Sequence, residues 1–572
     1  MDWFNPSFRI LLCALAITDV FSDRQRGNSS LPETIRPRAI PCIASGGEIG
    51  IPGGKKQMPL LPGWGHYHFE ISSSNDSAKI YFDQGLNLYY SYHARESAAS
   101  FKTAASFDSS SAMCYWGQAL AEGPFFNALG YYSMPEDLPA ILDAMSRKMN
   151  GATKKEQDLI LAMLQRYLIR GDEGKRKELN RRYAESLKSL MLNYPQDLDI
   201  RALYIDAVML EHPWDFWYGD GRPKPWTPEL IPLCEEILRA NPLHPGAMHY
   251  YIHLTEASRD PGRAAIEAKN LRMSMPGVAH MVHMASHVYE RSGQYENGVE
   301  VNDLAHRDIS LYDSLVHGTV SDWKVPHYLE VQAYCALNGA IMQRGKPIFD
   351  ECKRTAEPAK GDFDSQTMFM IPILAWTRMG YWDSILASPS PGISLTYCMV
   401  IYDFARGLAC LRKNDTKQAS RLGRSIDSLL TDPKLFEKDS LSPFSPKIFP
   451  ARVARNILQA EIFASSGNAD AAERLFNLAV SMEDSITYSE PKDWMLPARQ
   501  YFGNRLLEWK RPEDAEKIFR EDLIANPGNG WSLTGLCLSL LAQQKKSEAA
   551  VYAQMAKKSF SGSDLDIKAP VF

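Results

Sequence analysis

The chain has 572 residues, of which 45% are hydrophobic and 23% charged, and its net charge is −5. This is the composition of an ordinary globular protein with enough apolar residues for a large core, so it argues against a disordered chain. Acidic residues outnumber basic residues by 68 to 63. No overall basic field would therefore attract nucleic acid, and we expect no nucleic-acid partner.

The N-terminus has the pattern of a secretory signal peptide. A short apolar run over residues 10–17 follows Arg9, and the small residue Ser22 offers a cleavage point. The run is too short to cross a bilayer. We therefore expect residues 1–22 to be a signal peptide, the protein to be secreted into an extracellular or periplasmic space, and no membrane anchor to remain.

The rest of the chain divides by composition into three parts. Residues 23–66 are rich in Gly, Pro, Ser and Arg and predict an irregular leader. Residues 67–560 show helical periodicity with small and aromatic residues at tetratricopeptide-repeat (TPR) positions, as at Gly85, Phe101 and Ala104. We predict an all-α, TPR-type α-solenoid of stacked helical hairpins, followed by a C-terminal tail over residues 561–572.

One predicted repeat is stretched by an aromatic insertion over residues 212–226. It contains Trp214, Trp217 and Trp226, which is more aromatic surface than a passive loop needs. We predict that these tryptophans form a lid or a wall of a substrate pocket. An aromatic plug that only caps the core is the alternative.

A stripe of histidines and glutamate occurs twice, with the second copy 34 residues after the first. In each copy the side chains stand at i, i+4 and i+7, which places them on one face of an α-helix. Thirty-four residues is also the TPR period, so this register places both stripes on the concave groove. The two copies are His249, His253 and Glu256, and His283, His287 and Glu290.

Histidines at this spacing on two neighbouring helices are a candidate metal site. Packed helices lie roughly 8–10 Å apart, so imidazoles from both could share one ion at about 2.0–2.1 Å per nitrogen. His280 and His327 would bring the number of ligands to six, and His93 is a further candidate. An imidazole-rich site without thiolates suits copper, with zinc or iron as alternatives.

The glutamates and several nearby residues are the candidates for chemistry and substrate binding. Glu256 and Glu290 could act as general bases or orient the metal ligands. Asp206, Glu96 and Trp116 are predicted to line the pocket with the three tryptophans. A small molecule or a peptide held in the concave groove is the expected substrate.

Six stretches of the chain resemble a family of secreted or periplasmic TPR proteins, mostly bacterial and mostly without an assigned activity. The resemblance covers residues 65–540 and implies the repeat fold, but it brings no substrate. Two positions depart from the family pattern: Tyr92 replaces an asparagine and Ala285 replaces a proline. The stretches are YHARESAASF (92–101), AMCYWG (112–117), PWDFW (213–217), HYYIH (249–253), HMVHMASH (280–287) and REDL…NGWSL (520–533).

These patterns together predict a secreted metalloprotein that is a copper-dependent oxidoreductase. A zinc-dependent hydrolase with Glu256 or Glu290 as base is the variant for the same site. A non-catalytic TPR scaffold that binds a peptide or protein partner in the groove is the main alternative. A structural hydrogen-bond network of histidines is the remaining one.

Overall fold

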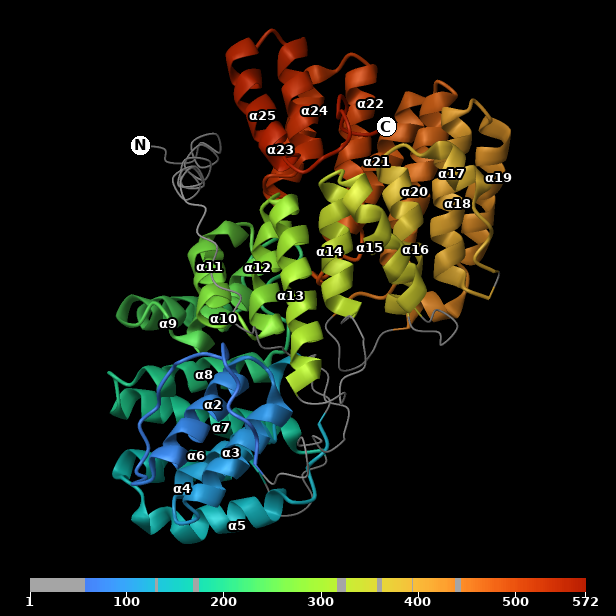
Figure 1. The fold of residues 1–572 in the computed structure, drawn as a ribbon. Helices are drawn as coiled ribbons and strands as arrows, with labels where there is room; N and C mark the ends of the chain where they lie inside the picture. The colour runs from blue at the N-terminus through green and yellow to red at the C-terminus, as the bar shows by residue number, and fades with distance from the viewer. Residues whose placement is uncertain are drawn as a thin grey trace. The chain divides into compact units, whose positions relative to one another are not determined.

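The computed structural model describes residues 57–128, 132–167, 174–315, 326–356, 363–392, 394–437 and 444–572. Within these ranges the chain is built from α-helices joined by short connections (Figure 1), and its only β pairing is an isolated bridge between Trp217 and Pro223. The predicted signal peptide and most of the predicted leader lie outside the described residues. None of the described helices is long and apolar enough to span a bilayer.

The helices follow one another through the chain in three groups. The first group is α2 (Asp76–Tyr90), α3 (Ala94–Phe107), α4 (Ala112–Ala121), α5 (Leu138–Lys148), α6 (Lys154–Arg166), α7 (Arg176–Asn193) and α8 (Leu198–Glu211). The central group is α9 (Thr227–Ala240), α10 (Pro245–Glu256), α11 (Ala265–Ser274), α12 (Ala279–Arg291), α13 (Tyr295–Leu315), α14 (Pro326–Asn338) and α15 (Met342–Thr355). The last group is α16 (Phe363–Arg378), α17 (Trp382–Ala387), α18 (Thr396–Arg412), α19 (Thr416–Leu429), α20 (Ile448–Ser465), α21 (Ala469–Asp484), α22 (Ala498–Glu508), α23 (Pro512–Ala525), α24 (Gly530–Ala542) and α25 (Lys546–Ser559).

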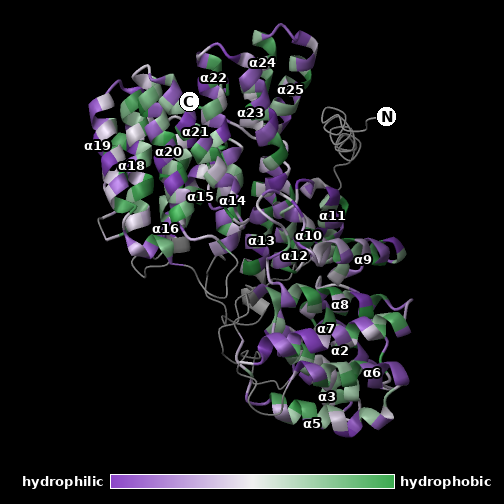
Figure 2. Ribbon diagram, turned by 180° about the vertical axis from the view of Figure 1, so that it is seen from behind, coloured by the Kyte–Doolittle hydropathy of each residue, from purple (hydrophilic) through white to green (hydrophobic). Residues whose placement is uncertain are grey.

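The packing of these helices is that of a TPR-type α-solenoid. Successive helices such as α12 and α13 contact each other as hairpins, and the first helices of successive hairpins also pack together, as in the series α8, α10, α12 and α14. Most helices carry both hydrophobic and hydrophilic residues along their length (Figure 2). Each hairpin therefore needs its neighbours to bury its apolar side.

Glycines at the small-residue positions of the repeat let helices approach an aromatic ring. A Cβ added to Gly85 or Gly117 would lie within 2.8 Å of the Phe101 ring. The same arrangement recurs near the C-terminus, where the Phe519 ring lies against Gly503 and Gly535. Because the same glycine–phenylalanine packing recurs, the spacing of small and aromatic residues in the sequence is enough to recognise the repeat.

The segments that flank the helices are packed against them. In the described part of the leader, Met58 and Trp64 are buried. After α25 ends, the Ser563 hydroxyl donates a hydrogen bond to the Ala340 carbonyl at 3.0 Å, and the Phe572 ring lies 5.8 Å from that of Trp531. Both segments thus contribute to the folded unit.

The C-terminal repeats also contact the central ones directly. Arg291, which ends α12, donates to the carbonyl of Ala525, and the Asn529 amide donates to the Tyr295 hydroxyl at 2.9 Å. The turns at Gly293 and Gly528 touch, since a Cβ on Gly293 would lie 2.0 Å from the Gly528 carbonyl oxygen. These contacts bring the connection between α21 and α22 close to the central histidines.

Candidate metal centre

The histidine stripe lies in the interior of the protein. Every residue of α10 and every residue of α12 except Tyr289 is buried. The insertion around Trp214 and the connection around Glu490 cover the stripe, as the prediction of a lid or pocket wall over these residues requires. The predicted ligands therefore form an enclosed cluster.

Three imidazoles converge at the first part of this cluster. His249 and His253 come from α10, and His280 comes from the next first helix, α12. Nδ1 of His249 lies 2.6 Å from the carbonyl oxygen of Tyr90, which only accepts, so this nitrogen carries the proton. Nε2 of neutral His249 therefore has its lone pair directed into the cluster.

That single lone pair faces two other ring nitrogens. Nε2 of His253 lies 3.2 Å from it and Nε2 of His280 lies 3.0 Å from it. Nδ1 of His253 is directed at Oε1 of Glu256, 2.9 Å away, so its Nε2 is also free to accept. Only one of the two neighbours could donate to His249, whereas a cation between the three nitrogens would satisfy all of them.

A second triad is built in the same way one repeat further on. His283 and His287 come from α12 and His327 from α14, and their ligand nitrogens lie within 4.8 Å of one another. Nδ1 of His283 donates to Oδ1 of Asn302 at 2.6 Å, while the amide nitrogen of Asn302 donates to the Gly298 carbonyl. The fixed amide leaves Nε2 of His283 as an acceptor, and it has no hydrogen-bond partner among the described residues.

A pair of carboxyl groups lies beside both triads. Oε1 of Glu490, from the connection between α21 and α22, lies 3.9 Å from Nδ1 of His253, and its Oε2 lies 3.6 Å from Nε2 of His287. Glu490 and Glu256 hydrogen-bond to each other, which requires a proton on one of them. Burial raises the pKa of Glu256 to about 8 and that of Glu490 well above its usual range, so the pair retains a proton at neutral pH.

Burial also keeps the metal-free histidines neutral. It lowers the pKa of His253 to about 3. Burial is the largest cause of the lowered pKa of His249, His280, His283 and His287 as well, and charge repulsion from neighbouring imidazoles adds to it. Neutral imidazole is the form that binds a metal ion, so the cluster is held in its ligand form.

Aromatic side chains surround the histidine cluster. The Tyr92 ring lies 4.3 Å from that of His249, and the Tyr328 ring stacks on His283 at 4.0 Å. Trp214 and Phe126 both meet the His253 ring, at 5.1 and 5.5 Å between ring centres. One of the three predicted tryptophans thus lies at the histidines.

The other two tryptophans hold the insertion in place. The Trp217 indole donates to the carbonyl of Leu254 on α10 at 2.8 Å. The Trp226 indole donates to the Asp215 carbonyl and stacks on His212. Neither has a ring contact with a cluster histidine, so their observed part is to anchor the loop that presents Trp214.

Four further predicted residues lie outside the triads. His93 and Glu96 form a pair of their own, with Nδ1 of His93 3.7 Å from Oε2 of Glu96. Asp206 accepts a hydrogen bond from Tyr89 at 2.5 Å. The Trp116 indole donates to the Leu159 carbonyl in the core between helices, so Trp116 does not reach the histidines.

Glu290 is buried one turn beyond His287 on α12. Its carboxylate oxygens have no hydrogen-bond partner among the described residues, and burial raises its pKa to about 8. Of the two glutamates in the stripe, only Glu256 contacts a triad directly.

Three residues of the site carry no sequence signal in the stripe itself: Glu490, Asn302 and Phe126. Glu490 lies far along the chain, in a connection that is long for a TPR turn and rich in charged and aromatic residues. That length is the one feature that could have drawn attention to it. Asn302 and Phe126 are recognisable only once their neighbours in space are known.

His327 is the most accessible member of the cluster. Its side chain is 35% exposed, whereas those of His253 and His287 are 2% and 0% exposed. Solvent therefore reaches the second triad more readily than the first.

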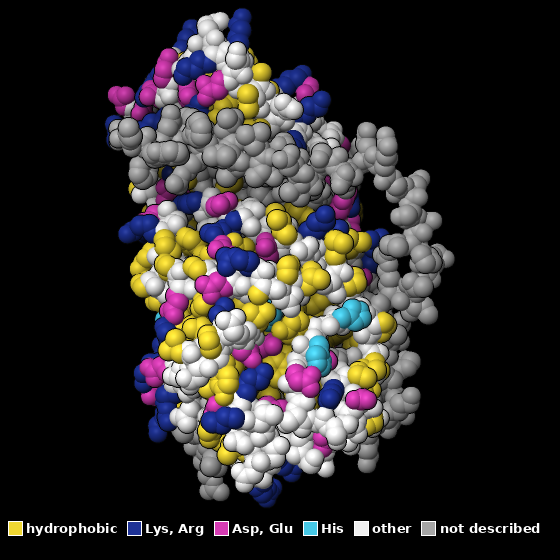
Figure 3. All heavy atoms as spheres, turned by 90° about the vertical axis from the view of Figure 1, so that its left-hand side faces the viewer, with side chains coloured by type: hydrophobic (Ala, Val, Ile, Leu, Met, Phe, Trp, Pro, Cys, Tyr) yellow, Lys and Arg dark blue, Asp and Glu magenta, His cyan; other side chains and the backbone are white. Residues whose placement is uncertain are grey.

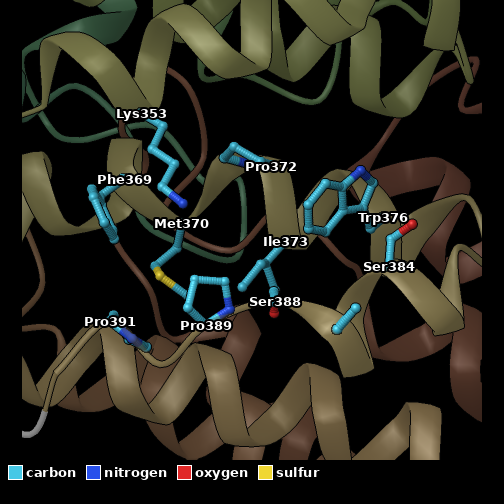
Figure 4. Close-up of a pocket in the computed structure, with 11 residues that line it drawn as sticks. Lys353, Phe369, Met370, Pro372, Ile373, Trp376, Ser384, Ser388, Pro389 and Pro391 are labelled. Atoms are coloured by element: carbon cyan, nitrogen blue, oxygen red, sulfur yellow. The ribbon is translucent and has the colours of Figure 1, made fainter.

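A separate pocket lies away from the histidines. It has a volume of about 340 Å³ and lies between α16, α17 and the start of the next connection, with Lys353 of α15 at its rim (Figure 4). Its lining is mainly apolar, with Phe369, Pro372 and Trp376 among it. No ligand nitrogen of the triads lines it.

The exposed charges form no field of one sign on the face shown in Figure 3, where basic and acidic side chains are interspersed. This agrees with the near balance of charge in the sequence.

Comparisons with known proteins add little to this description. No protein-family model matches the chain, and no curated protein shows significant similarity to it. Among solved structures, the human IFIT1 dimer with m7Gppp-AAAA is 13% identical, with 85% of this chain and 90% of that chain covered and a TM-score of 0.29. Yeast Tom70 is 11% identical, with 84% and 89% covered and a TM-score of 0.27. Likenesses this remote assign neither a family nor a ligand.

Proposed function

We propose that this protein binds copper in its buried histidine cluster and is a copper-dependent oxidoreductase. The observation that carries the proposal is the convergence of Nε2 of His249, His253 and His280, in which one lone pair meets two other nitrogens at 3.2 and 3.0 Å. A buried array of this kind is unfavourable when empty and becomes favourable around a cation.

The donor set supports copper over the alternatives. No cysteine belongs to any ligand group of the described residues, and imidazole nitrogen is a donor that copper, zinc, iron and nickel accept. Copper(II) leads the affinity order of divalent ions for such sites. Zinc and iron remain the alternatives that elemental analysis would distinguish.

The enclosure of the cluster supports an enzyme with a small substrate. Trp214, Phe126 and Tyr92 shield the first triad from water, and an extended peptide groove along the stripe is absent from the described helices because the stripe is buried. The exposed side of His327 is the approach available to a small molecule or to one side chain of a peptide. Exclusion of water and a narrow approach to the site favour an enzyme over a non-catalytic scaffold.

The proposed reaction removes two electrons and two protons from an organic substrate. Dioxygen is the oxidant that the proposal requires, and it takes up both electrons and both protons to become hydrogen peroxide. Bound copper would supply the electron transfer. The Glu256–Glu490 pair, which burial keeps partly protonated at neutral pH, is the local group suited to accept and release protons.

Secretion is part of the same proposal and rests on residues 1–22. Outside the cytosol, a histidine site of this kind would meet copper without competition from the thiol pool. Expression of the full chain in a secreting host, followed by N-terminal sequencing of the exported protein, would test it. An N-terminus still at Met1 would contradict it.

Elemental analysis of the purified secreted protein tests the metal, and oxygen uptake tests the reaction. We expect stoichiometric copper and substrate-dependent formation of peroxide with a panel of phenols, amines and short peptides. Stoichiometric zinc with hydrolysis of the panel would replace the oxidoreductase with a zinc hydrolase. Absence of any bound or acquired metal would leave a non-catalytic TPR scaffold for a peptide or protein partner.

A further inference from the structure

The two triads differ from the single shared site that the sequence predicts. In each triad, the two histidines of an i, i+4 pair are joined by a third histidine from the first helix of the following hairpin. His280 of α12 joins His249 and His253 of α10. His327 of α14 joins His283 and His287 of α12. The repeat geometry therefore builds the same three-nitrogen arrangement twice.

One ion cannot serve both triads. Two nitrogens that each bind an ion at about 2.0–2.1 Å lie no more than about 4.2 Å apart. Within each triad the ligand nitrogens lie within 4.8 Å of one another, which needs only a small adjustment, but no group of six histidine nitrogens meets that limit in the described chain. The triads are nevertheless adjacent, since the rings of His280 and His283 are 6.2 Å apart, as are those of His253 and His287.

The protons on the ring nitrogens agree with two separate sites. The Tyr90 carbonyl fixes Nε2 of His249 as the ligand atom of the first triad, and Asn302 fixes Nε2 of His283 as a ligand atom of the second. Each triad thus has its own orienting group, Tyr90 at the end of α2 for the first and Asn302 on α13 for the second. Such outer partners are typical of real metal sites, where they hold the ligand ring in place.

The buried carboxyl groups supply a reason for a second ion. Six neutral imidazoles offer no negative charge, whereas Glu256 and Glu490 lie beside both triads: Oε2 of Glu256 is 3.8 Å from Nδ1 of His287, and Oε2 of Glu490 is 3.8 Å from Nε2 of His327. Buried carboxyls are costly without a cation nearby. Cations held by the triads would offset the negative charge that both carboxyls carry once they are deprotonated.

We infer that the cluster is a two-ion centre, with one ion held by His249, His253 and His280 and the other by His283, His287 and His327. This inference rests on the proposed function in requiring that the cluster binds metal, and it adds the number of ions and the division of ligands. The Glu256–Glu490 pair is the shared carboxyl element between the two ions. Two adjacent redox ions would match a two-electron reaction.

Titration of the chelator-stripped full chain with copper(II) tests the inference through stoichiometry. We expect two equivalents in the wild-type protein, one in His280→Gln and one in His327→Gln. His244→Asn is the matched control, because His244 is also a buried histidine and caps α10 through the Ala247 amide, yet belongs to neither triad. It should keep both equivalents.

Electron paramagnetic resonance of the same samples gives an independent readout. Each single-triad variant should show the signal of one isolated copper(II), while two neighbouring ions in the wild-type protein should broaden or weaken each other's signal. One equivalent in the wild-type protein would overturn the two-ion centre and leave the proposed metal site standing. No copper uptake at all would overturn both. If His280→Gln fails to fold, the wild-type protein and His327→Gln, whose side chain is partly exposed, still decide the question.

Discussion

Oε1 of Glu490 lies 3.9 Å from Nδ1 of His253, although His253 belongs to the central group of helices and Glu490 to a connection within the last group. The contact exists because the C-terminal repeats return to the central ones, with Gly528 against Gly293 and Arg291 bonded to the Ala525 carbonyl. A histidine cluster built on the neighbouring helices α10, α12 and α14 is therefore closed by a connection that belongs to the last group of helices. This closure places the histidine cluster in the interior of the protein.

Replacing one ligand in each triad should abolish metal binding. We expect His253→Gln combined with His287→Gln to weaken copper affinity by more than about 100-fold, since even the loss of an orienting partner typically costs 10–100-fold. Glutamine keeps much of the side-chain volume, which matters because both histidines are buried. Isothermal titration would measure the affinity, and far-UV circular dichroism would report the fold.

His244→Asn provides the comparison for this double variant. Asparagine is a good N-cap and can replace the acceptor that His244 offers to the Ala247 amide. The control should retain both copper affinity and helical content. A double variant that keeps wild-type affinity would contradict the ligand assignment.

Asn302 should act through His283 alone. Asn302→Ala removes the acceptor of the 2.6 Å hydrogen bond from Nδ1 of His283 and should weaken the second site by about 10–100-fold while leaving the first unchanged. Asn302→Asp keeps an acceptor at the same place and should restore most of the affinity. Equal weakening of both sites in Asn302→Ala would point to a general loss of packing instead.

The ligand types and their period follow from the sequence, because the helix repeats every 3.6 residues and the TPR unit every 34. Those two periods predict that His249, His253, His283 and His287 share one region, which they do. They do not predict how the histidines are divided between the two triads. His280 joins the pair on α10 because α12 packs beside α10, and His327 joins the pair on α12 because α14 packs beside α12.

The closure of the site could not be predicted from the same periods. A repeat pattern describes contacts between neighbours, whereas Glu490 reaches the cluster through contacts between repeats that are far apart in the chain. Trp116 illustrates the opposite error. The sequence predicts a place for Trp116 in the substrate pocket, but its ring is fully buried in the core against Phe69 and Phe82.

The metal-free protein should be most stable in a mildly acidic window, between about pH 4.5 and 6.5. The pKa of His253 falls from 6.5 to about 3 on folding, so its contribution is complete above pH 6.5 and is lost as the pH falls toward 3. The pKa of Glu290 rises from 4.5 to about 8, so its contribution is complete below pH 4.5 and is lost as the pH rises toward 8. Between pH 4.5 and 6.5 the two contributions change in opposite directions and offset each other, so the Tm of the chelator-treated protein should decline below about pH 4.5 and above about pH 6.5.

Glu290→Gln separates the two arms of this profile. A glutamine cannot ionise, so the variant should lose less stability than the wild-type protein between pH 6.5 and 8. Below pH 5 the stability of both proteins should change with pH in the same way. Differential scanning calorimetry at several pH values would measure the difference. An unchanged alkaline arm would show that Glu290 is not the protonated carboxyl that its burial predicts.

Trp214 should control how fast metal leaves the first triad. Its indole meets the His253 ring at 5.1 Å and is backed by Phe126 at 5.1 Å, so its removal opens a path for water and chelator. Trp214→Ala keeps the left-handed backbone requirement at this position, where φ is 60°, and thus changes only the side chain. We expect the rate of metal removal by EDTA to rise about tenfold, which corresponds to about 1.4 kcal/mol of barrier.

Trp376→Ala is the matched control, because Trp376 is also half-buried but lines the separate pocket, and its loss should leave the rate unchanged. Equal rates in the two variants would mean that Trp214 does not shield the metal centre.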